Sequence, residues 1–247
     1  PGREGAGLVR ALYRDPPLRA FQPEYQAFNR HSKIPTLVHD GRPVIQSSEI
    51  ARYLDERFPE PRLRPDEPAA RATMREWIAE EQEYLFPLIV TLSFNLMMKL
   101  RSAGFGMAQL EEWSLRHPDQ DRAQDYLRRV SGPPDHAAVD AAAARFRWHM
   151  AHLENVLNAG GGPWICGADY SLADICVAPI LDRVESLDLA RLWADLPAVG
   201  AWFGQMKARP AFRQAAPPFE YRMWGPRKPP PARPVDPVAA GDTFPAA

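Results

Sequence analysis

The fold of this chain is decided by residues 33–50, which read KIPTLVHDGRPVIQSSEI. Residues 36–39 are short, mostly apolar and partly β-branched, which favours a strand. The pair Asp40-Gly41 follows, and this pair is the strongest short signal for a two-residue hairpin turn. Val44 and Ile45 then return as a second strand. The stretch therefore predicts a β-hairpin.

The two ends of this hairpin carry a proline and the start of a helix. Pro35 opens the first strand, where a missing N–H is tolerated, and the bond before a proline can be cis. On the other side, Ser47 or Ser48 is expected to cap a helix that begins near Glu49. A free strand edge and a helix N-terminus then point toward one spot. Such a corner suits a small anionic peptide.

The proline, the hairpin and the polar pair Gln46-Ser47 together resemble the glutathione-binding segment of the glutathione transferase superfamily. The resemblance implies that Ile34, the residue before the cis-proline, offers its backbone N–H and C=O to the cysteinyl part of glutathione, as in strand addition. It also implies that the polar pair holds the γ-glutamyl carboxylate at the helix N-terminus. Many members have Glu-Ser at this pair, and Gln-Ser is a variant. The implied glutathione-binding residues are Lys33, Ile34, Pro35, Gln46 and Ser47.

The same resemblance implies an α+β protein of two domains, with a thioredoxin-like N-terminal half and an all-α C-terminal half. It covers about residues 8–215. Less specific motifs, among them residues 63–68, resemble segments of the bacterial glutathione-dependent β-aryl etherases. Clustered prolines indicate a stiff linker between the halves, and the end of the chain is too poor in apolar residues to fold alone. We expect a partial thioredoxin-like domain at 1–60, a linker at 61–68, a helical domain at 69–216 and a proline-rich tail at 217–247.

The thioredoxin-like half is expected to be incomplete. Residues 8–13 suit the second strand of that fold and residues 23–28 a turn of helix, so the first strand and first helix would be missing. In the family, the serine, tyrosine or cysteine that stabilises the glutathione thiolate follows the first strand. No residue is assigned that role, because the hydroxyls of Tyr13, Ser32 and Ser47 do not match the motif.

Beyond residue 68 the hydrophobic period is helical. We predict one long helix over residues 68–99, in which Pro87 produces a kink or a break in the hydrogen-bond ladder. Ser171, with Asp174 three residues later, predicts a capping box at the start of a buried helix. The other helices are expected at residues 47–58, 110–115, 122–130, about 139–157 and 197–209, the last one ended by Pro210.

Two further patterns allow both a chemical and a structural interpretation. His149 and His152 are three residues apart on one helix face, as metal ligands can be. However, Glu154 points elsewhere and no other ligand cluster accompanies them, so no metal site is predicted. An apolar stripe on the long helix could line a pocket, but such stripes more often belong to a core or a subunit interface, which we favour. Its members are Tyr84, Phe94, Met97 and Met98.

The composition is that of an ordinary soluble globular protein. Of 247 residues, 45% are hydrophobic and 25% are charged, which is enough apolar material for a sizeable core. The 30 basic and 31 acidic residues give a net charge of −1, so nothing favours nucleic acid or an anionic membrane as a partner. No apolar run approaches the ~20 residues of a membrane span. Cys166 and Cys176 have neither redox nor metal-ligand spacing, which fits a reducing compartment.

The resemblance, together with these observations, implies a cytoplasmic, homodimeric, glutathione transferase-like enzyme. Glutathione would be its co-substrate, and the thiolate would attack a small hydrophobic electrophile, forming a thioether or cleaving an ether. The alternative is a non-catalytic glutathione transferase-like module that binds partners or small molecules. At the level of residues, the alternative is a plain hairpin in which Ser47 only caps a helix.

Overall fold

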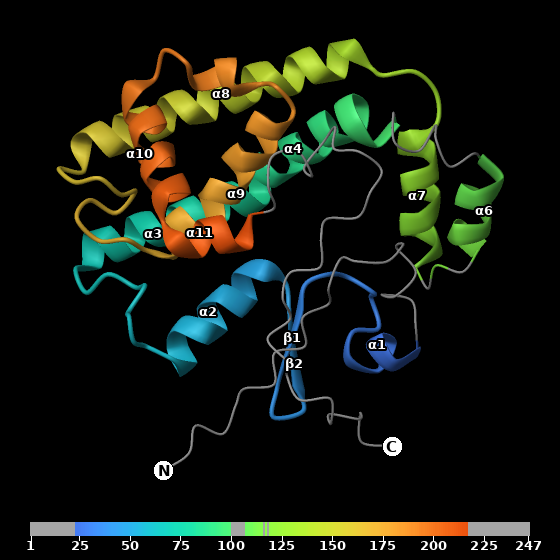
Figure 1. Cartoon of the computed structure of the whole chain (residues 1–247), viewed down its shortest axis with the longest axis horizontal. Coiled ribbons are helices and arrows are strands. Elements are labelled where there is room, and N and C mark those ends of the chain that lie inside the picture. Colours follow the sequence, from blue (N-terminus) through green and yellow to red (C-terminus); the bar gives the residue numbers. More distant parts are fainter. Residues whose placement is uncertain (1–22, 100–106, 116, 118, 217–247) are drawn as a thin grey trace.

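The computed structural model describes residues 23–99, 107–115, 117 and 119–216. In this part of the chain, a small α+β unit lies beside a larger set of helices, as expected (Figure 1). The α+β unit contains α1 (Pro23–Phe28), β1 (Thr36–His39), β2 (Arg42–Ile45) and α2 (Ser47–Arg57). The strand expected at 8–13 and the tail expected at 217–247 lie outside the described residues. The domain boundaries stay a prediction.

The hairpin is confirmed in position and turn type. β1 and β2 are antiparallel, with Thr36 opposite Ile45 and His39 opposite Arg42. Asp40 and Gly41 have φ angles of 49° and 73°. Two consecutive positive φ angles define the type I′ turn that an Asp-Gly pair favours. The register therefore follows from the turn residues, and it fixes which residues lie opposite each other at the open end.

The start of α2 differs from the prediction. The helix begins at Ser47, and Gln46 is its N-cap residue, with a φ of 74° and no side-chain hydrogen bond to the helix. The carbonyl of Gln46 accepts the first helical hydrogen bond, from the Ile50 N–H at 2.9 Å. Because the positive φ turns the chain into the helix at once, both serines lie inside the first turn. Neither Ser47 nor Ser48 caps α2, so the prediction of a serine cap was wrong.

The long helix runs without interruption from residue 68 to 98, but it changes its hydrogen-bond register twice. It consists of α3 (Pro68–Glu80), the π-helical turn Glu81–Leu85, α4 (Phe86–Ser93) and the π-helical turn Phe94–Met98. The Phe86 N–H donates to the Glu81 carbonyl, five residues back, immediately before Pro87. The expected disturbance at Pro87 is therefore a π turn, which shifts the ladder where the proline has no N–H to donate.

The other helices agree with the sequence pattern, apart from their ends. α7 begins earlier than expected because Asp119 accepts a hydrogen bond from the Arg122 N–H at 2.9 Å. A further helix follows α10, because Pro210 ends one helix and also suits the first position of the next. These elements are α6 (Met107–Leu115), α7 (Gln120–Val130), α8 (His136–Ala159), α9 (Leu172–Ser186), the 3₁₀ turn Ala190–Trp193, α10 (Pro197–Ala208) and α11 (Pro210–Ala215).

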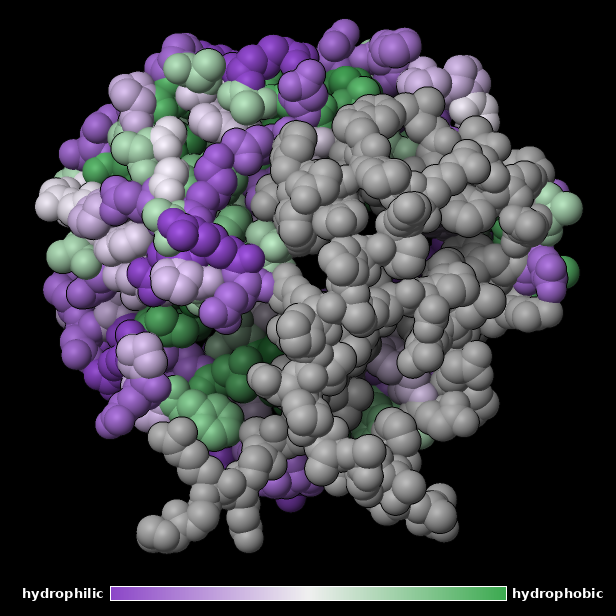
Figure 2. All heavy atoms as spheres, viewed as in Figure 1, coloured by the Kyte–Doolittle hydropathy of each residue, from purple (hydrophilic) through white to green (hydrophobic). Residues whose placement is uncertain are grey.

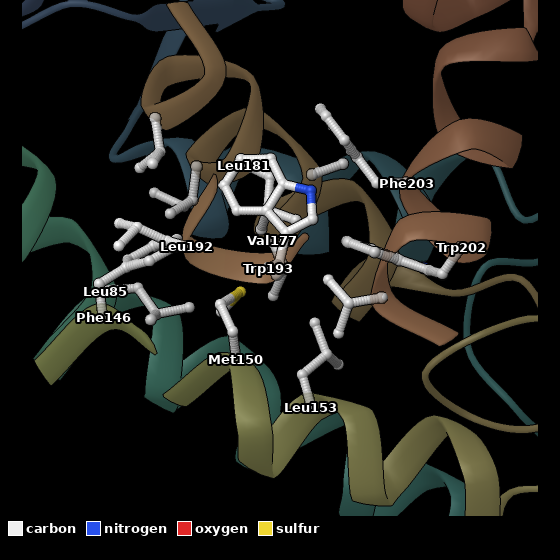
Figure 3. Packing of buried hydrophobic residues seen from close by; sticks show 14 of the residues in the cluster. Leu85, Phe146, Met150, Leu153, Val177, Leu181, Leu192, Trp193, Trp202 and Phe203 are labelled. Carbon is white, nitrogen blue, oxygen red and sulfur yellow. The ribbon is translucent and has the colours of Figure 1, made fainter. Parts of the chain in front are cut away.

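The core of the helical part surrounds α9, whose Val177 and Leu181 are completely buried. Figure 3 shows side chains of α8 and α10 meeting around this helix. On the face drawn in Figure 2, hydrophilic and hydrophobic residues are interspersed over the described surface. No helix in the described part of the chain is long and apolar enough to cross a membrane. The labelled core residues are Leu85, Phe146, Met150, Leu153, Val177, Leu181, Leu192, Trp193, Trp202 and Phe203.

Candidate functional site

The hairpin register brings together the two segments that the sequence singled out. Thr36 pairs with Ile45 at the open end of the hairpin, so the next residues outward, Pro35 and Gln46, lie at the same edge. The five predicted residues are all exposed, and Ile34 is 44% exposed. The structure thus places Lys33, Ile34, Pro35, Gln46 and Ser47 around one accessible corner.

The loop before β1 presents an unused stretch of backbone. The peptide bond between Ile34 and Pro35 is cis, as the sequence allowed. Neither the N–H nor the C=O of Ile34 is hydrogen-bonded to a residue that the structure describes. By contrast, the Lys33 carbonyl accepts hydrogen bonds from the Tyr25 hydroxyl at 2.6 Å and from the Asn29 side-chain amide at 2.8 Å. The loop is fixed at Lys33 and leaves the polar groups of Ile34 accessible.

Buried polar residues that the sequence did not single out hold this loop in place. The Asn29 amide also donates to the Thr36 hydroxyl at 2.9 Å, and the Thr36 hydroxyl is 2.8 Å from that of Tyr25. Asn29 and Thr36 are both buried. Their pairing depends on how the chain folds back after α1, and no sequence motif marks it. The network rigidifies the corner, since buried polar groups that are fully hydrogen-bonded define one geometry.

The N-terminus of α2 supplies three further donors. The backbone N–H groups of Ser47, Ser48 and Glu49 have no acceptor among the described residues. Other helices of eight or more residues that begin after described non-helical residues each have a side-chain acceptor for N–H groups of the first turn. These acceptors are Glu67 for α3, Asp119 for α7, Asp135 for α8, Ser171 for α9 and Glu154 for α10. An anion at the open end of α2 would therefore supply the acceptors that these N–H groups lack.

The charges near this helix end suit an anion. Glu49 in the first turn would repel a carboxylate, but its side chain forms an ion pair with Arg52. The hydrogen bond from Arg52 to Glu49 and the charge of Glu49 raise the pKa of the arginine, which keeps it cationic. Lys33 is exposed on the opposite side of the corner. The partial positive charge of the helix N-terminus is thus not cancelled by Glu49.

The histidines of α8 and the nearby Glu154 do not form a second site. His149 pairs with Glu80, the His152 ring lies 5.3 Å from the Trp77 ring, and the Glu154 carboxylate binds the start of α10. No cluster of three potential metal ligands occurs among the described residues.

The residues of the apolar stripe on the long helix differ in burial: Met97 is buried in the core, whereas Tyr84 is 45% exposed.

A hollow of about 570 Å³ lies between the start of α3, the end of α8 and residues 165–169. None of the five corner residues lines this hollow.

No thiolate-stabilising residue can be assigned from the described part of the chain. The Ser32 side chain is buried and 3.4 Å from the Gln26 amide, while Tyr13 lies outside the described residues. Burial raises the pKa of the Cys166 thiol to about 11 and that of the Cys176 thiol to about 12. Both cysteines are therefore protonated and unreactive at neutral pH.

Comparison with known proteins identifies the family. The model of the glutathione S-transferase N-terminal domain matches residues 11–62, and that of the C-terminal domain matches residues 114–210. The chain belongs to the glutathione transferase superfamily. Protein LigF of Sphingobium sp. strain SYK-6 is 27% identical to this chain over 198 residues, which cover 77% of the chain and 76% of LigF. The crystal structure of this β-etherase matches with a TM-score of 0.72 at 26% identity, over 82% of the chain and 86% of LigF.

Other relatives of this chain are named as an isomerase and as a glutathione S-transferase. The maleylacetoacetate isomerase of Pseudomonas aeruginosa is 29% identical over 204 residues, which cover 79% of the chain and 76% of the isomerase. Glutathione S-transferase GstB of Escherichia coli is 25% identical over 197 residues, which cover 77% of the chain and 76% of GstB. These matches confirm a glutathione S-transferase-like enzyme, and LigF confirms the resemblance to the bacterial β-aryl etherases.

Proposed function

We propose that this transferase binds glutathione at Lys33, Ile34, Pro35, Gln46 and Ser47. The backbone of Ile34 would pair with the cysteinyl residue of glutathione, and the first turn of α2 would hold the γ-glutamyl carboxylate. The observation that carries the proposal is the open N-terminus of α2, which the hairpin register places beside the free backbone of Ile34. A crystal structure of a relative from Burkholderia graminis, with two glutathione molecules bound per subunit, shares the fold at 23% identity and a TM-score of 0.56.

The proposed reaction is nucleophilic displacement by the glutathione thiolate. The sulfur lone pair forms a new carbon–sulfur bond on the electrophile, and the bond to the leaving group breaks. The leaving group departs with the bonding electrons and takes up a proton. If the leaving group is an alkoxide or phenoxide, the reaction is ether cleavage, and the similarity to a β-etherase supports this branch. The residue that stabilises the thiolate stays unassigned.

We also propose a homodimer that uses an exposed aromatic surface, defined by Tyr84 and Trp148. These residues are 45% and 55% exposed. The rings of Tyr84 and Trp148 lie 5.5 Å and 4.8 Å from that of His149, so they form one surface over the long helix and α8. Clustered exposed aromatic residues are typical of interfaces.

We also propose a cytoplasmic location, which the two free cysteines support.

The experiment that tests the proposed function combines binding and turnover. Glutathione is titrated into the purified protein by calorimetry, and an aryl halide and a β-aryl ether are then offered with glutathione. Saturable binding with release of halide or phenol supports the enzyme. Saturable binding without turnover of either electrophile favours the non-catalytic module. An absence of binding at millimolar glutathione contradicts both.

A further inference from the structure

We propose that Gln82 is a positioning residue for the glutathione site, although it belongs to the helical part of the molecule. This inference rests on the proposed function, because it concerns the same corner. Gln82 would act through Ser48, by holding the first turn of α2 in the orientation that glutathione requires.

The contact itself joins two distant segments of the chain. The side-chain amide of Gln82 donates a hydrogen bond to the Ser48 hydroxyl, across 34 residues of sequence. Ser48 is the second residue of α2, and its backbone N–H is one of the three open donors, together with those of Ser47 and Glu49. A hydrogen bond at this position therefore acts on the turn that presents those donors, without occupying any of them.

The helical side of this contact is anchored in the hydrophobic core. Gln82 lies in the π-helical turn Glu81–Leu85, and Leu85 in the same turn is completely buried in the core. A π turn inserts an extra residue into a helical turn, and such turns occur frequently at functional sites. Here the turn combines the buried Leu85 with an exposed Gln82 side chain that reaches Ser48.

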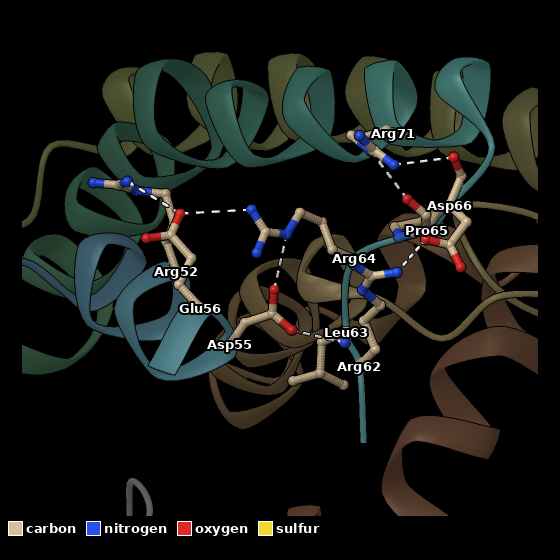
Figure 4. Close-up of polar contacts among 9 residues, drawn as sticks. All are labelled: Arg52, Asp55, Glu56, Arg62, Leu63, Arg64, Pro65, Asp66 and Arg71. Carbon is tan, nitrogen blue, oxygen red and sulfur yellow. Dashed lines mark hydrogen bonds and ion pairs between the residues drawn. The ribbon is translucent and has the colours of Figure 1, made fainter. Parts of the chain in front are cut away.

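The opposite end of α2 is attached independently. The buried Asp55 carboxylate accepts hydrogen bonds from the Leu63 N–H at 2.8 Å and from Arg64 Nε at 3.1 Å, as Figure 4 shows. The Leu63 carbonyl in turn accepts a hydrogen bond from the Leu172 N–H at the start of α9, at 3.0 Å. α2 is thus held at its C-terminal end by the linker. Ala51 of α2 packs against the hydrophobic core, and the bond from Gln82 to Ser48 adds a polar contact at the first turn.

The test measures glutathione affinity by calorimetry for Gln82→Ala, Ser48→Ala and the double variant. Each single variant should bind glutathione about fivefold more weakly, which is the scale of one neutral hydrogen bond. The double variant should be no weaker than the single ones, because both changes remove the same contact. Glu83→Ala, an exposed neighbour in the same turn, should bind like the wild type.

A second control separates positioning from general weakening of the contact between the two parts. Arg64→Ala loosens the opposite end of α2 and should lower the melting temperature more than Gln82→Ala does, with a smaller effect on glutathione affinity. Unchanged affinity in Gln82→Ala, or additive losses in the double variant, would overturn the role of Gln82 and leave the proposed function intact. If the wild type binds no glutathione, the proposed function itself fails.

Discussion

The N-termini of α9 and α2 differ in whether the protein itself supplies hydrogen-bond acceptors for the first backbone N–H groups of the helix. At α9, the Leu172 N–H donates to the Leu63 carbonyl, and the Ser171 hydroxyl accepts from the next two backbone N–H groups. The Asp174 carboxylate completes the capping box and has no exposed surface. At α2, the first three N–H groups have no acceptor among the described residues, and Gln46 adopts a positive φ of 74°.

The difference separates a folding role at α9 from the binding role that we propose for α2. The first N–H groups of any helix need acceptors, and a side-chain cap typically contributes about 1 kcal/mol of stability. α9 meets this need from its own sequence and is closed to ligands. α2 leaves the need unmet at the surface, next to a loop with free backbone groups, so an anionic ligand can provide the missing acceptors and stabilise the folded state by binding.

The largest effect is expected at the closed helix end. Asp174→Ala should lower the free energy of unfolding by about 3 kcal/mol or more, because several buried donors lose their acceptor. These donors are the Ser171 N–H at 2.9 Å, the Ile165 N–H at 3.0 Å and the Trp202 indole N–H at 2.8 Å. Urea unfolding measures the change, with the exposed Asp140→Ala on α8 as a control near zero. A loss equal to that of Asp140→Ala would contradict the account.

The next effect is expected at the open helix end. Ser47→Ala should weaken glutathione binding about tenfold, as expected for one hydrogen bond to a charged group. Its free energy of unfolding without glutathione should hardly change, because the Ser47 side chain is exposed and does not cap α2. Calorimetry measures the affinity, with the exposed Ser131→Ala as the serine control for binding, and urea unfolding measures the stability of Ser47→Ala against the wild type. Unchanged glutathione affinity would remove Ser47 from the site.

The smallest effect is expected for the serine at the closed end. Ser171→Ala should lower the free energy of unfolding by about 1 kcal/mol, the usual loss for a helix cap. Under conditions in which both proteins are folded, the glutathione affinity of Ser171→Ala should match that of the wild type. Ser47→Ala should thus change glutathione affinity but not stability, whereas Ser171→Ala should change stability but not glutathione affinity. If both serines changed the same quantity, the distinction between the two helix ends would be lost.

Sequence was sufficient where the determining residues are neighbours in the chain. Asp40-Gly41 specified the turn, and Ser171 and Asp174 specified the capping box, whereas Pro35 only allowed the cis bond that precedes it. Sequence failed where the cause is a distant contact or an unusual backbone angle. The positive φ of Gln46, which moved the start of α2, has no local signature, since glutamine rarely adopts it.

The same limit applies to the residues that support the site. The bonds from Asn29 to Thr36 and from Gln82 to Ser48 join segments that only the folded chain brings together. The five corner residues were predicted from the resemblance of residues 33–47 to the glutathione-binding segment of the family, and that prediction needs only residues close together in sequence. Their supporting contacts could not be recognised from sequence alone.

The central claim is that glutathione binds at the open end of α2 and not at the closed end of α9. Hydrogen–deuterium exchange of the purified protein, with and without glutathione, tests it most directly. We predict that peptides covering residues 33–36 and 46–50 exchange rapidly in the free protein and become protected by glutathione. Peptides covering residues 171–175 should be protected equally in both states. Glutathione-dependent protection confined to other segments, with residues 46–50 unchanged, would contradict the account.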